Sequence, residues 1–331
     1  MDKLLTVSVA AYNVSSYLPK LISSVTDADV TDHIEVLIIN DGSTDDTAAI
    51  ANDFEKRFPS AIRVIHQENG GHGSTVNRGI REANGKYFRA LDGDDWLHSA
   101  SLRKLVMRLA DLDADLIVAP YCECHEGGEE TVVSRFSALE KERVYPLEEV
   151  VKRVPWMSFH TLIYKTALLR EHDIRLDENC FYEDTEYALY PLPHVNTVYC
   201  FGDHLYCYRT GLSGQSVSVE GRVRHIDDGW LVTEHLLDFL NREKERLSPA
   251  CVSYMVRGIA GQCCFHLQSM LLLPKGAEAL QMIRRFDGMV AAKSPAVYSE
   301  MASRVKAFRI LRATGYLAYG MVRRHRNREF Q

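Results

Sequence analysis

Short apolar runs alternate with amphipathic stretches through the first part of the chain. Residues 34–39 form a nearly continuous apolar, β-branched run, which is typical of a strand covered on both faces of a parallel sheet. Because strands alternate with helices at this spacing, the pattern predicts right-handed βαβ units. The predicted strands are 6–11, 34–39, 62–66 and 86–91, and the predicted helices run from Ser15 or Ser16 to about 25, from a cap at Ser43 or Thr44 to about 58, and through Asn77 and Gly79.

The pattern becomes less regular after Trp96 and wholly helical from about residue 223. The acidic segment 181–187 begins a short helix that Pro191 and Pro193 end. The further predictions are helices at 99–112, 165–172, 252–272 and 276–290, strands at 115–121 and 156–164, a hairpin at Gly127–Gly128, and one or two strands within 196–208.

These patterns predict an α/β domain, a mostly parallel sheet flanked by helices, over residues 1–222, followed by a helical C-terminal region over 223–331. A length of 331 residues is enough for two such parts. Apolar residues at 46% and charged residues at 25% match an ordinary globular protein, which excludes a disordered or fibrous chain.

The chain carries no apolar run of the ~18 residues that a membrane span requires, and its first residues lead directly into a strand pattern. Its eight cysteines lack the spacing of a disulfide framework. No second ligand pair with zinc spacing follows Cys122, Cys124 and His125. We therefore expect reduced thiols and a cytoplasmic protein.

The segment 304–328 contains eight Arg or Lys residues and no Asp or Glu. Its charge of +8 leaves −14 for the remainder of a chain whose net charge is −6. Apolar side chains interleave with the basic ones, which suits an amphipathic helix lying peripherally on an anionic membrane, here the inner membrane face. The alternative is an exposed basic helix whose apolar side packs on the protein. The apolar members are Phe308, Leu311, Tyr316, Leu317, Tyr319 and Val322.

Polar segments follow each of the four predicted strands at its carboxyl end. Tyr12 follows the first strand, Asp41 the second, the glycine-rich loop 69–74 the third and the acidic cluster 92–95 the fourth. Because ligands of open α/β sheets bind beyond these ends, we expect the segments to meet at one rim. Asp41 fits either a ligand contact or a turn before a helix, and the glycines fit either a phosphate loop or ordinary turns.

The acidic cluster holds three carboxylates, those of Asp92, Asp94 and Asp95, within four positions. Two unit charges ~4 Å apart repel by about 4 kcal/mol at an effective dielectric of 20, so a half-buried cluster favours a bound cation. A divalent cation with oxygen ligands is the natural candidate. The alternative is a solvated turn in which an aspartate caps the next helix.

The order and spacing of these motifs resemble glycosyltransferase family 2 across roughly residues 4–216. The resemblance implies a GT-A fold, a nucleotide-diphosphate sugar donor, a divalent metal, Mn²⁺ or Mg²⁺, and transfer with inversion of the anomeric centre. It also implies a nucleotide-sugar-binding half, 1–98, and an acceptor half, 99–222. The motifs are Val7 to Asn13, Asn40-Asp41-Gly42-Ser43-Thr44-Asp45, Asn69-Gly70-Gly71 with Asn77, Asp92-Gly93-Asp94-Asp95, and Glu183-Asp184.

Carried over residue by residue, the resemblance makes Tyr12 and Asp41 contacts to the nucleobase, usually uracil. Asp92 would reach the ribose side of the nucleotide, and Asp94 would hold the metal on the diphosphate. The complete nucleotide-sugar site that we expect is Ala11, Tyr12, Asn13, Asp41, Gly70, Gly71, Asn77, Asp92, Gly93, Asp94 and Arg209.

The same resemblance makes Asp184 the catalytic base and leaves Asp95 and Glu183 as supporting acids. Arg209, with the loop through Ser216, looks like the segment that closes over donor or acceptor in many members. A general base of this kind typically accelerates a transfer about 10²–10⁴-fold. The alternative for the pair 183–184 is two acids favoured by a helix dipole.

The expected function is transfer of a sugar from a UDP-sugar or related donor to a glycan or lipid-linked acceptor, in polysaccharide or glycolipid assembly. Nothing indicates a nucleic-acid partner. His72 has no role that the resemblance transfers, and a surface histidine is the simpler interpretation. Two alternatives are a non-catalytic nucleotide-sugar-binding protein and a dinucleotide-binding oxidoreductase, but the G-x-G-x-x-G of the second class is missing after the first strand.

Overall fold

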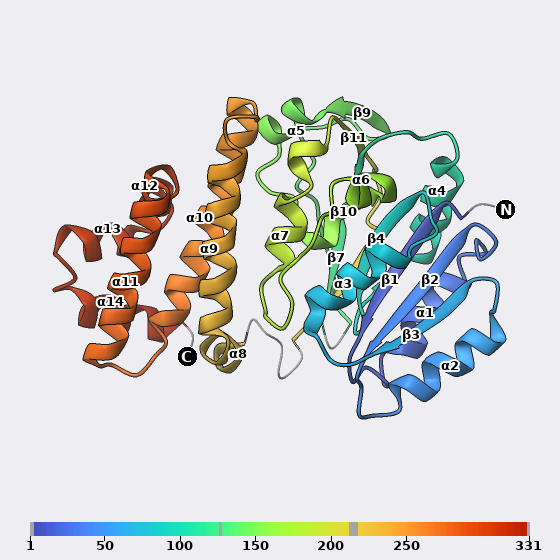
Figure 1. Ribbon diagram of the computed structural model, residues 1–331, viewed down its shortest axis with the longest axis horizontal. Coiled ribbons are helices and arrows are strands. Elements are labelled where there is room, and N and C mark those ends of the chain that lie inside the picture. The colour runs from blue at the N-terminus through green and yellow to red at the C-terminus, as the bar shows by residue number, and fades with distance from the viewer. Residues whose placement is uncertain (1–2, 126–127, 212–217, 330–331) are drawn as a thin grey trace. The chain divides into compact units, whose positions relative to one another are not determined.

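The computed structural model describes residues 3–125, 128–211 and 218–329, with the side chains of 326–329 outside that description. The chain divides into two compact units, 1–212 and 213–331 (Figure 1). The sequence pattern alone places this division at 222.

The first unit is built on an eight-stranded sheet. Its strands are β1 Leu5–Ala11, β2 Ile34–Asp41, β3 Ile62–Gln67, β4 Tyr87–Asp92, β6 Leu116–Val118, β9 Arg143–Pro146, β10 Leu162–Lys165 and β11 Thr197–Cys200. They lie in the order β3-β2-β1-β4-β10-β6-β11-β9. Strands β3, β2, β1 and β4 are parallel, as predicted, and every residue of β2 is buried.

The register brings the carboxyl ends of the four parallel strands together. Asp41 pairs with Gln67, and Ala10 pairs with Asp92, while β1 and β2 end side by side. The segments that follow these strands therefore meet at one rim of the sheet.

Helices flank this part of the sheet (Figure 1). They are α1 Leu18–Thr26, α2 Thr47–Arg57, α3 Gly71–Glu82 and α4 Ser99–Leu109. α3 packs on β1 and β2, while α1 packs against α2 and α4. Pro19 lies in the first turn of α1, as predicted. The predicted cap of α2 at Ser43 or Thr44 is wrong, because the helix begins at Thr47 with Asp46 as its N-cap residue.

The first unit also contains a smaller sheet, in the order β5-β12-β7-β8. Its strands are β5 Trp96–Leu97, β7 Tyr121–His125, β8 Glu130–Val133 and β12 Tyr206–Thr210. The predicted strand 115–121 is therefore two strands, β6 and the start of β7. Strands β7 and β8 are antiparallel, as a hairpin requires, although Gly127 lies outside the described residues.

The remaining helices of the first unit are short. They are α5 Leu147–Arg153, the 3-10 turn η1 Phe159–Thr161, α6 Thr166–Glu171, α7 Asp184–Leu189 and the 3-10 turn η2 Leu192–His194. The predicted strand 156–164 is wrong over most of its length, because only its end belongs to β10. All eight cysteines of the chain are buried, and none of them forms a disulfide bond.

In the second unit every described element is a helix. The helices are α8 Val219–Arg224, α9 Ile226–Glu243, α10 Pro249–Met270, α11 Ala277–Lys293, α12 Pro295–Arg304, α13 Lys306–Ala313 and α14 Tyr319–Glu329. α10 packs against α9, α11 and α12. Within the described ranges, no helix combines the length and the apolar character that crossing a bilayer requires.

The basic segment 304–328 is not the single amphipathic helix that its pattern predicts. It spans α13 and α14, which are separated by a turn where Gly315 and Tyr316 have φ angles of 54° and 68°. The apolar side chains that pack inward, each at most 5% exposed, are Phe308, Leu311, Tyr319 and Val322. These four side chains therefore pack on the protein, as the alternative to the membrane interpretation predicts.

Candidate active site

Asp41, at the end of β2, fixes the glycine-rich start of α3. Its side chain is buried; Oδ1 accepts hydrogen bonds from Gln67 Nε2 at 2.7 Å and Gly70 N at 3.0 Å, and Oδ2 accepts one from Gly71 N at 2.9 Å. Gly71 has a φ of 82°, and a Cβ there would lie 3.2 Å from Asn179 N. The glycines therefore serve the fold of the loop, with their N–H groups held by Asp41.

Tyr12 and Asn13 follow β1 at the same rim, directly after Ala11, which is buried in the strand. Tyr12 is 51% exposed, so its ring is accessible from solvent. Asn13 has a φ of 52°, and its Oδ1 accepts hydrogen bonds from Thr44 N at 2.8 Å and from Asp45 N at 3.3 Å. This contact holds Thr44 in the loop, which is why α2 begins later than its cap signal predicts.

The acidic cluster is tied to β12 through Tyr206, which sequence reasoning missed. The Tyr206 hydroxyl lies 2.8 Å from Asp92 Oδ2 and 2.5 Å from Asp95 Oδ2, and Arg209 N donates to Asp95 Oδ1 at 2.6 Å. Burial, with the charges of Asp92 and Asp94, raises the pKa of Asp95 well above its ordinary value. Asp95 thus holds β12 in place.

Asp94 keeps a partly exposed side chain at this rim. Burial, helped by the charge of Asp92, raises the pKa of Asp94 to about 6. Its carbonyl accepts a hydrogen bond from Arg209 Nε at 2.9 Å, so Arg209 lies at the cluster. Gly93 is required for close packing, because a Cβ there would lie 2.6 Å from the carbonyl oxygen of Ala10.

A metal could be held beside the cluster. Asp92, Asp95 and His160 offer ligand atoms that all lie within 4.8 Å of one another, whereas Asp94, the ligand expected from sequence, is not in this group. Burial lowers the pKa of His160 to about 4, so its ring is neutral, as a metal ligand must be. Carboxylate oxygens with one imidazole nitrogen suit Mn²⁺.

The second acid pair lies at the start of α7. Glu183 is the N-cap residue and is 2% exposed, while Asp184 is the first helical residue and exposes its side chain. Solvent reaches part of the Asp184 side chain, but many protein atoms surround its carboxyl group. This burial, together with the charge of Glu183, raises the pKa of Asp184 to about 7. A general base works best with a pKa near the working pH.

His72 links the two acid centres, contrary to the surface position expected for it. Its Nδ1 donates to Glu183 Oε1 at 2.6 Å, and its Nε2 lies 3.0 Å from Asp92 Oδ1, an ion-pair contact without a well-aligned hydrogen bond. Burial would lower the pKa of His72, but the contacts and charges of the two carboxylates outweigh it and raise the pKa well above its ordinary value. The imidazole therefore lies between two carboxyl groups, which favour its protonated form.

Asn77, on the buried side of α3, binds the chain that leads to α7. Its Nδ2 donates to Leu176 O and to Glu178 Oε1, both at 2.9 Å, and its Oδ1 accepts from Leu176 N at 2.9 Å. The described contacts of this amide thus go to protein groups of Leu176 and Glu178.

Arg209 packs its guanidinium over two aromatic rings, 4.8 Å from the centre of Tyr17 and 4.9 Å from that of Trp96. The loop Ser213 to Ser216 that follows lies outside the described residues. Tyr206, His160 and His72 had no local signal in the sequence, because each meets its acid partner through the fold alone.

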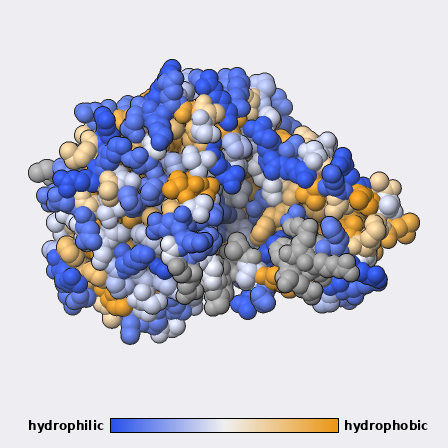
Figure 2. Space-filling model, turned by 180° about the vertical axis from the view of Figure 1, so that it is seen from behind, coloured by the Kyte–Doolittle hydropathy of each residue, from blue (hydrophilic) through white to orange (hydrophobic). Residues whose placement is uncertain are grey.

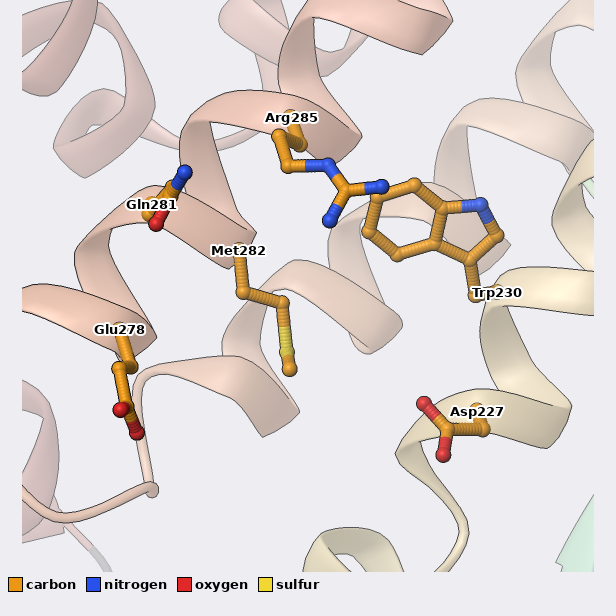
Figure 3. A pocket seen from close by; sticks show the side chains of 6 residues that line it. All are labelled: Asp227, Trp230, Glu278, Gln281, Met282 and Arg285. Carbon is orange, nitrogen blue, oxygen red and sulfur yellow. The ribbon is translucent and has the colours of Figure 1, made fainter.

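The helical unit has a separate cavity of about 370 Å³ between α9 and α11. Figure 3 shows Met282 projecting into it and the Arg285 guanidinium beside the Trp230 ring, whose centre is 5.9 Å away. No residue of the sequence-predicted site lines this cavity, whose other lining residues are Asp227, Glu278 and Gln281.

Comparison with known proteins places the chain in a family. The model of the family described as "Glycosyl transferase family 2" matches residues 6–173. The "Uncharacterized glycosyltransferase EpsJ" of Bacillus subtilis (strain 168) is 30% identical over 218 residues, which cover 63% of this chain and 62% of that protein. The "Poly(ribitol-phosphate) beta-N-acetylglucosaminyltransferase TarS" of Staphylococcus aureus (strain Mu50 / ATCC 700699) is 24% identical over 64% of this chain and 36% of its own length. The chain thus spans less than two thirds of these curated relatives.

Solved structures share the fold. S. aureus TarS 1–349 in complex with UDP-GlcNAc aligns with a TM-score of 0.56 over 91% of both chains at 18% identity. The mannosyltransferase PcManGT from Pyrobaculum calidifontis, in complex with GDP-Man and Mn²⁺, aligns with a TM-score of 0.56 over 99% of this chain and 87% of its own at 16% identity. The fold is therefore of the GT-A type, and with half of its length matched by the family model, the chain belongs to glycosyl transferase family 2.

Proposed function

We propose that this protein transfers a sugar from a nucleotide-diphosphate sugar to an acceptor hydroxyl, with inversion, in polysaccharide or glycolipid assembly. The observation that carries the proposal is the meeting of two acid centres: Asp92 and Glu183 lie 3.0 Å and 2.6 Å from the two nitrogens of His72. Direct displacement needs one acid centre at the donor and another at the acceptor, and the two acid centres joined by His72 would supply them.

The donor would lie along the rim of the parallel strands. Tyr12, which is 51% exposed, would contact the base, and Asp92 the ribose. Asp41 would act indirectly, by holding the glycine loop through its hydrogen bonds to Gly70 and Gly71. Asn77 would also act indirectly, through its hydrogen bonds to Leu176 in the proposed acceptor half. TarS was solved with UDP-GlcNAc and PcManGT with GDP-Man, which supports a nucleotide-diphosphate sugar as the donor class.

Asp94 would hold the divalent metal, whose charge would stabilise the departing diphosphate as a Lewis acid. The group of Asp92, Asp95 and His160 is the alternative metal site. Asp184 would accept the proton of the acceptor hydroxyl while its oxygen bonds to the anomeric carbon. The diphosphate leaves from the opposite face with the electron pair of the broken bond. Arg209, whose guanidinium hydrogen-bonds the Asp94 carbonyl, would add positive charge near the diphosphate.

The alternative is a nucleotide-sugar-binding protein without turnover. Calorimetry with UDP and Mn²⁺, followed by a donor-hydrolysis and transfer assay over a panel of sugar nucleotides, separates the two. Binding with turnover supports the transferase, binding without turnover supports the alternative, and absence of binding contradicts both.

We also propose that the helical unit contacts an anionic membrane, where a lipid-linked acceptor would be found. Ile310, Leu317 and Met321 are 41%, 91% and 63% exposed within or beside the basic helices α13 and α14. Hydrophobic surface gathers at the end of the helical unit at the right of Figure 2. We call Ile310, Leu317 and Met321, with exposed Lys306, Arg309 and Arg324, the basic-apolar surface.

A shallow cavity of about 440 Å³ belongs to this surface. It is lined by Leu317, Gly320, Met321, Arg324 and His325, so apolar and basic groups share one concave site. Lipid bilayers with anionic headgroups present the complementary combination of apolar chains and negative charge.

A further inference from the structure

His72 occupies the second position of α3 and meets acids from both halves of the first unit. Its Nδ1 binds Glu183 Oε1 at 2.6 Å, and its Nε2 faces Asp92 Oδ1 at 3.0 Å. Each ring nitrogen of His72 thus faces one carboxylate oxygen. The contact therefore joins a strand end of the proposed donor half to the N-cap residue of α7 in the proposed acceptor half.

The surroundings of His72 leave its ring little freedom. The ring packs edge-on against Phe159, with the two centres 5.4 Å apart, and Thr75 Oγ1 donates to the His72 carbonyl at 2.7 Å. The next residue, Gly73, allows α3 to approach the chain before α7, because a Cβ there would lie 1.9 Å from Asp177 O and 3.1 Å from Glu183 Cγ. The close approach is built into the backbone, and His72 lies at its centre.

The geometry points to His72 as a positioning residue: we propose that it holds the start of α7, and with it Asp184, at a fixed place relative to Asp92. The inference rests on the proposed function and deepens it, since it names the residue that couples the donor side of the site to the acceptor side. Glu183 is the N-cap residue of α7 and Asp184 follows it directly, so any displacement of Glu183 moves the proposed base.

The expected effect is large because misplacement of reacting groups by about 1 Å can cost about 10²-fold in rate. His72 acts through its two carboxylate partners and need not touch substrate. Loss of its contact with Glu183 should lower kcat, whereas loss of its contact with Asp92 should raise the KM for the donor.

Three substitutions separate these contacts. In His72→Asn the side-chain amide stands near the place of Nδ1 and keeps the bond to Glu183, and in His72→Gln it stands near the place of Nε2 and keeps the contact with Asp92. His72→Ala loses both. We expect kcat to fall about 10²-fold in the alanine and glutamine variants and by less than about tenfold in the asparagine variant. The donor KM should rise in the alanine and asparagine variants and stay near the wild-type value in the glutamine variant.

The readouts distinguish positioning from a general loss of structure. His33→Ala, at the amino end of β2, is the matched control and should leave kcat and KM unchanged. If in all three His72 variants kcat falls and KM rises together, in proportion to a fall in melting temperature, the residue is merely structural and the proposal is wrong. Wild-type values of both constants in all three variants would overturn it equally.

Calorimetry with UDP and Mn²⁺ tests the Asp92 contact without turnover. The glutamine variant should bind with the wild-type Kd, and the asparagine and alanine variants more weakly; equal Kd values in all would contradict the coupling. A wild-type protein that binds UDP and transfers no sugar contradicts the proposed function, whereas an active wild type with unaffected His72 variants contradicts this inference alone.

Discussion

Carboxyl groups in the candidate site differ in pKa because their neighbours differ. Burial alone would raise the pKa of Asp92, but the contact and charge of His72 lower it to about 2. Burial raises the pKa of Asp94 to about 6 and that of Asp184 to about 7, where the charges of Asp92 and Glu183 respectively add to the rise. Near pH 7 Asp92 is therefore a fixed anion, while Asp184 has the affinity that a proton acceptor needs.

Replacing the proposed base should abolish transfer and spare binding. We expect Asp184→Asn to lower kcat by about 10²–10⁴-fold, because an amide cannot accept the acceptor proton. Its Kd for UDP with Mn²⁺ should remain within about twofold of wild type, as measured by calorimetry. Near-normal turnover in this variant would contradict the assignment of the base.

The pH dependence of the wild type provides a second check on Asp184. The carboxyl group must be ionised to accept a proton, and its folded pKa is raised to about 7. Activity should therefore fall as the pH drops below about 7 and reach a plateau above it. A profile of kcat/KM that stays flat from pH 5 to 8 would show that a group with an unshifted carboxyl pKa acts instead.

Removing the Asp94 carboxylate, the proposed metal ligand, should weaken the binding of UDP. Asp94→Ala should lose the part of UDP affinity that depends on Mn²⁺ while keeping the metal-independent part, since the diphosphate then lacks its counter-charge. Calorimetry with and without Mn²⁺ measures the difference. Asp53→Ala, on an exposed face of α2, is the control. An unchanged Mn²⁺ dependence in Asp94→Ala would transfer the ligand role to the group that includes His160.

Among the elements, the parallel half of the sheet was predictable because its inner strands β1 and β2 are buried on both faces and apolar along most of their length. The segment 156–164 is rich in apolar residues as well, but part of its backbone hydrogen-bonds to a side chain and not to a neighbouring strand. Arg89 donates to the carbonyls of Leu162 and His160 at 2.7 Å and 2.5 Å. The His160 carbonyl lies outside β10 and is satisfied by this side chain, and no local pattern reveals an arginine more than seventy positions away.

The basic segment was misread for the same reason. Asp287 on α11 accepts a hydrogen bond from Arg312 Nη2 at 2.6 Å and another from the Tyr316 hydroxyl. These contacts fix the turn at Gly315 and Tyr316. The helical pattern of the sequence shows no break at these two positions, so it does not reveal the turn. The acid motifs of the site were readable because their members are neighbours in sequence, whereas His72, by contrast, gains its partners only when α3 meets β4 and α7.

One substitution at two glycines should have opposite effects on stability. Gly73→Ala forces a Cβ to within 1.9 Å of Asp177 O, so we expect a loss of about 1–3 kcal/mol and impaired transfer. Gly288→Ala, on an exposed face of α11 with nothing within 4 Å of the added Cβ, should gain roughly 0.5–1 kcal/mol. Urea unfolding monitored by fluorescence measures both. Equal stability of the Gly73→Ala variant and wild type would mean that the approach of α3 to α7 is looser than described.

Over the whole molecule, charge is distributed unevenly. The segment 304–328 carries +8 and the remainder −14. A negative surface therefore attracts one end of the chain and repels the rest, which favours a single orientation. Each Lys or Arg close to an anionic membrane contributes about 1 kcal/mol, and the exposed apolar side chains of the basic-apolar surface would add to that attraction on insertion.

The membrane contact can be tested with the full chain and a matched pair of variants. Wild type should sediment with vesicles of phosphatidylglycerol and phosphatidylcholine, and remain in solution with phosphatidylcholine alone. High salt should release it, because the Debye length falls from about 10 Å at 0.1 M to about 3 Å at 1 M. The variant Leu317→Glu/Met321→Glu should bind at least about tenfold more weakly, since burying one such side chain contributes about 1.5–3 kcal/mol.

Met107→Glu is the control for that variant, because Met107 on α4 is 66% exposed, close to the 63% of Met321, and lies outside the basic-apolar surface. It should bind vesicles as wild type does. If wild type ignores anionic vesicles but forms a dimer in light scattering that the Leu317→Glu/Met321→Glu variant loses, the surface binds a second copy of the chain and the membrane proposal is wrong. Binding that survives the double substitution would instead assign the contact to charge alone, since the variant keeps Lys306, Arg309 and Arg324.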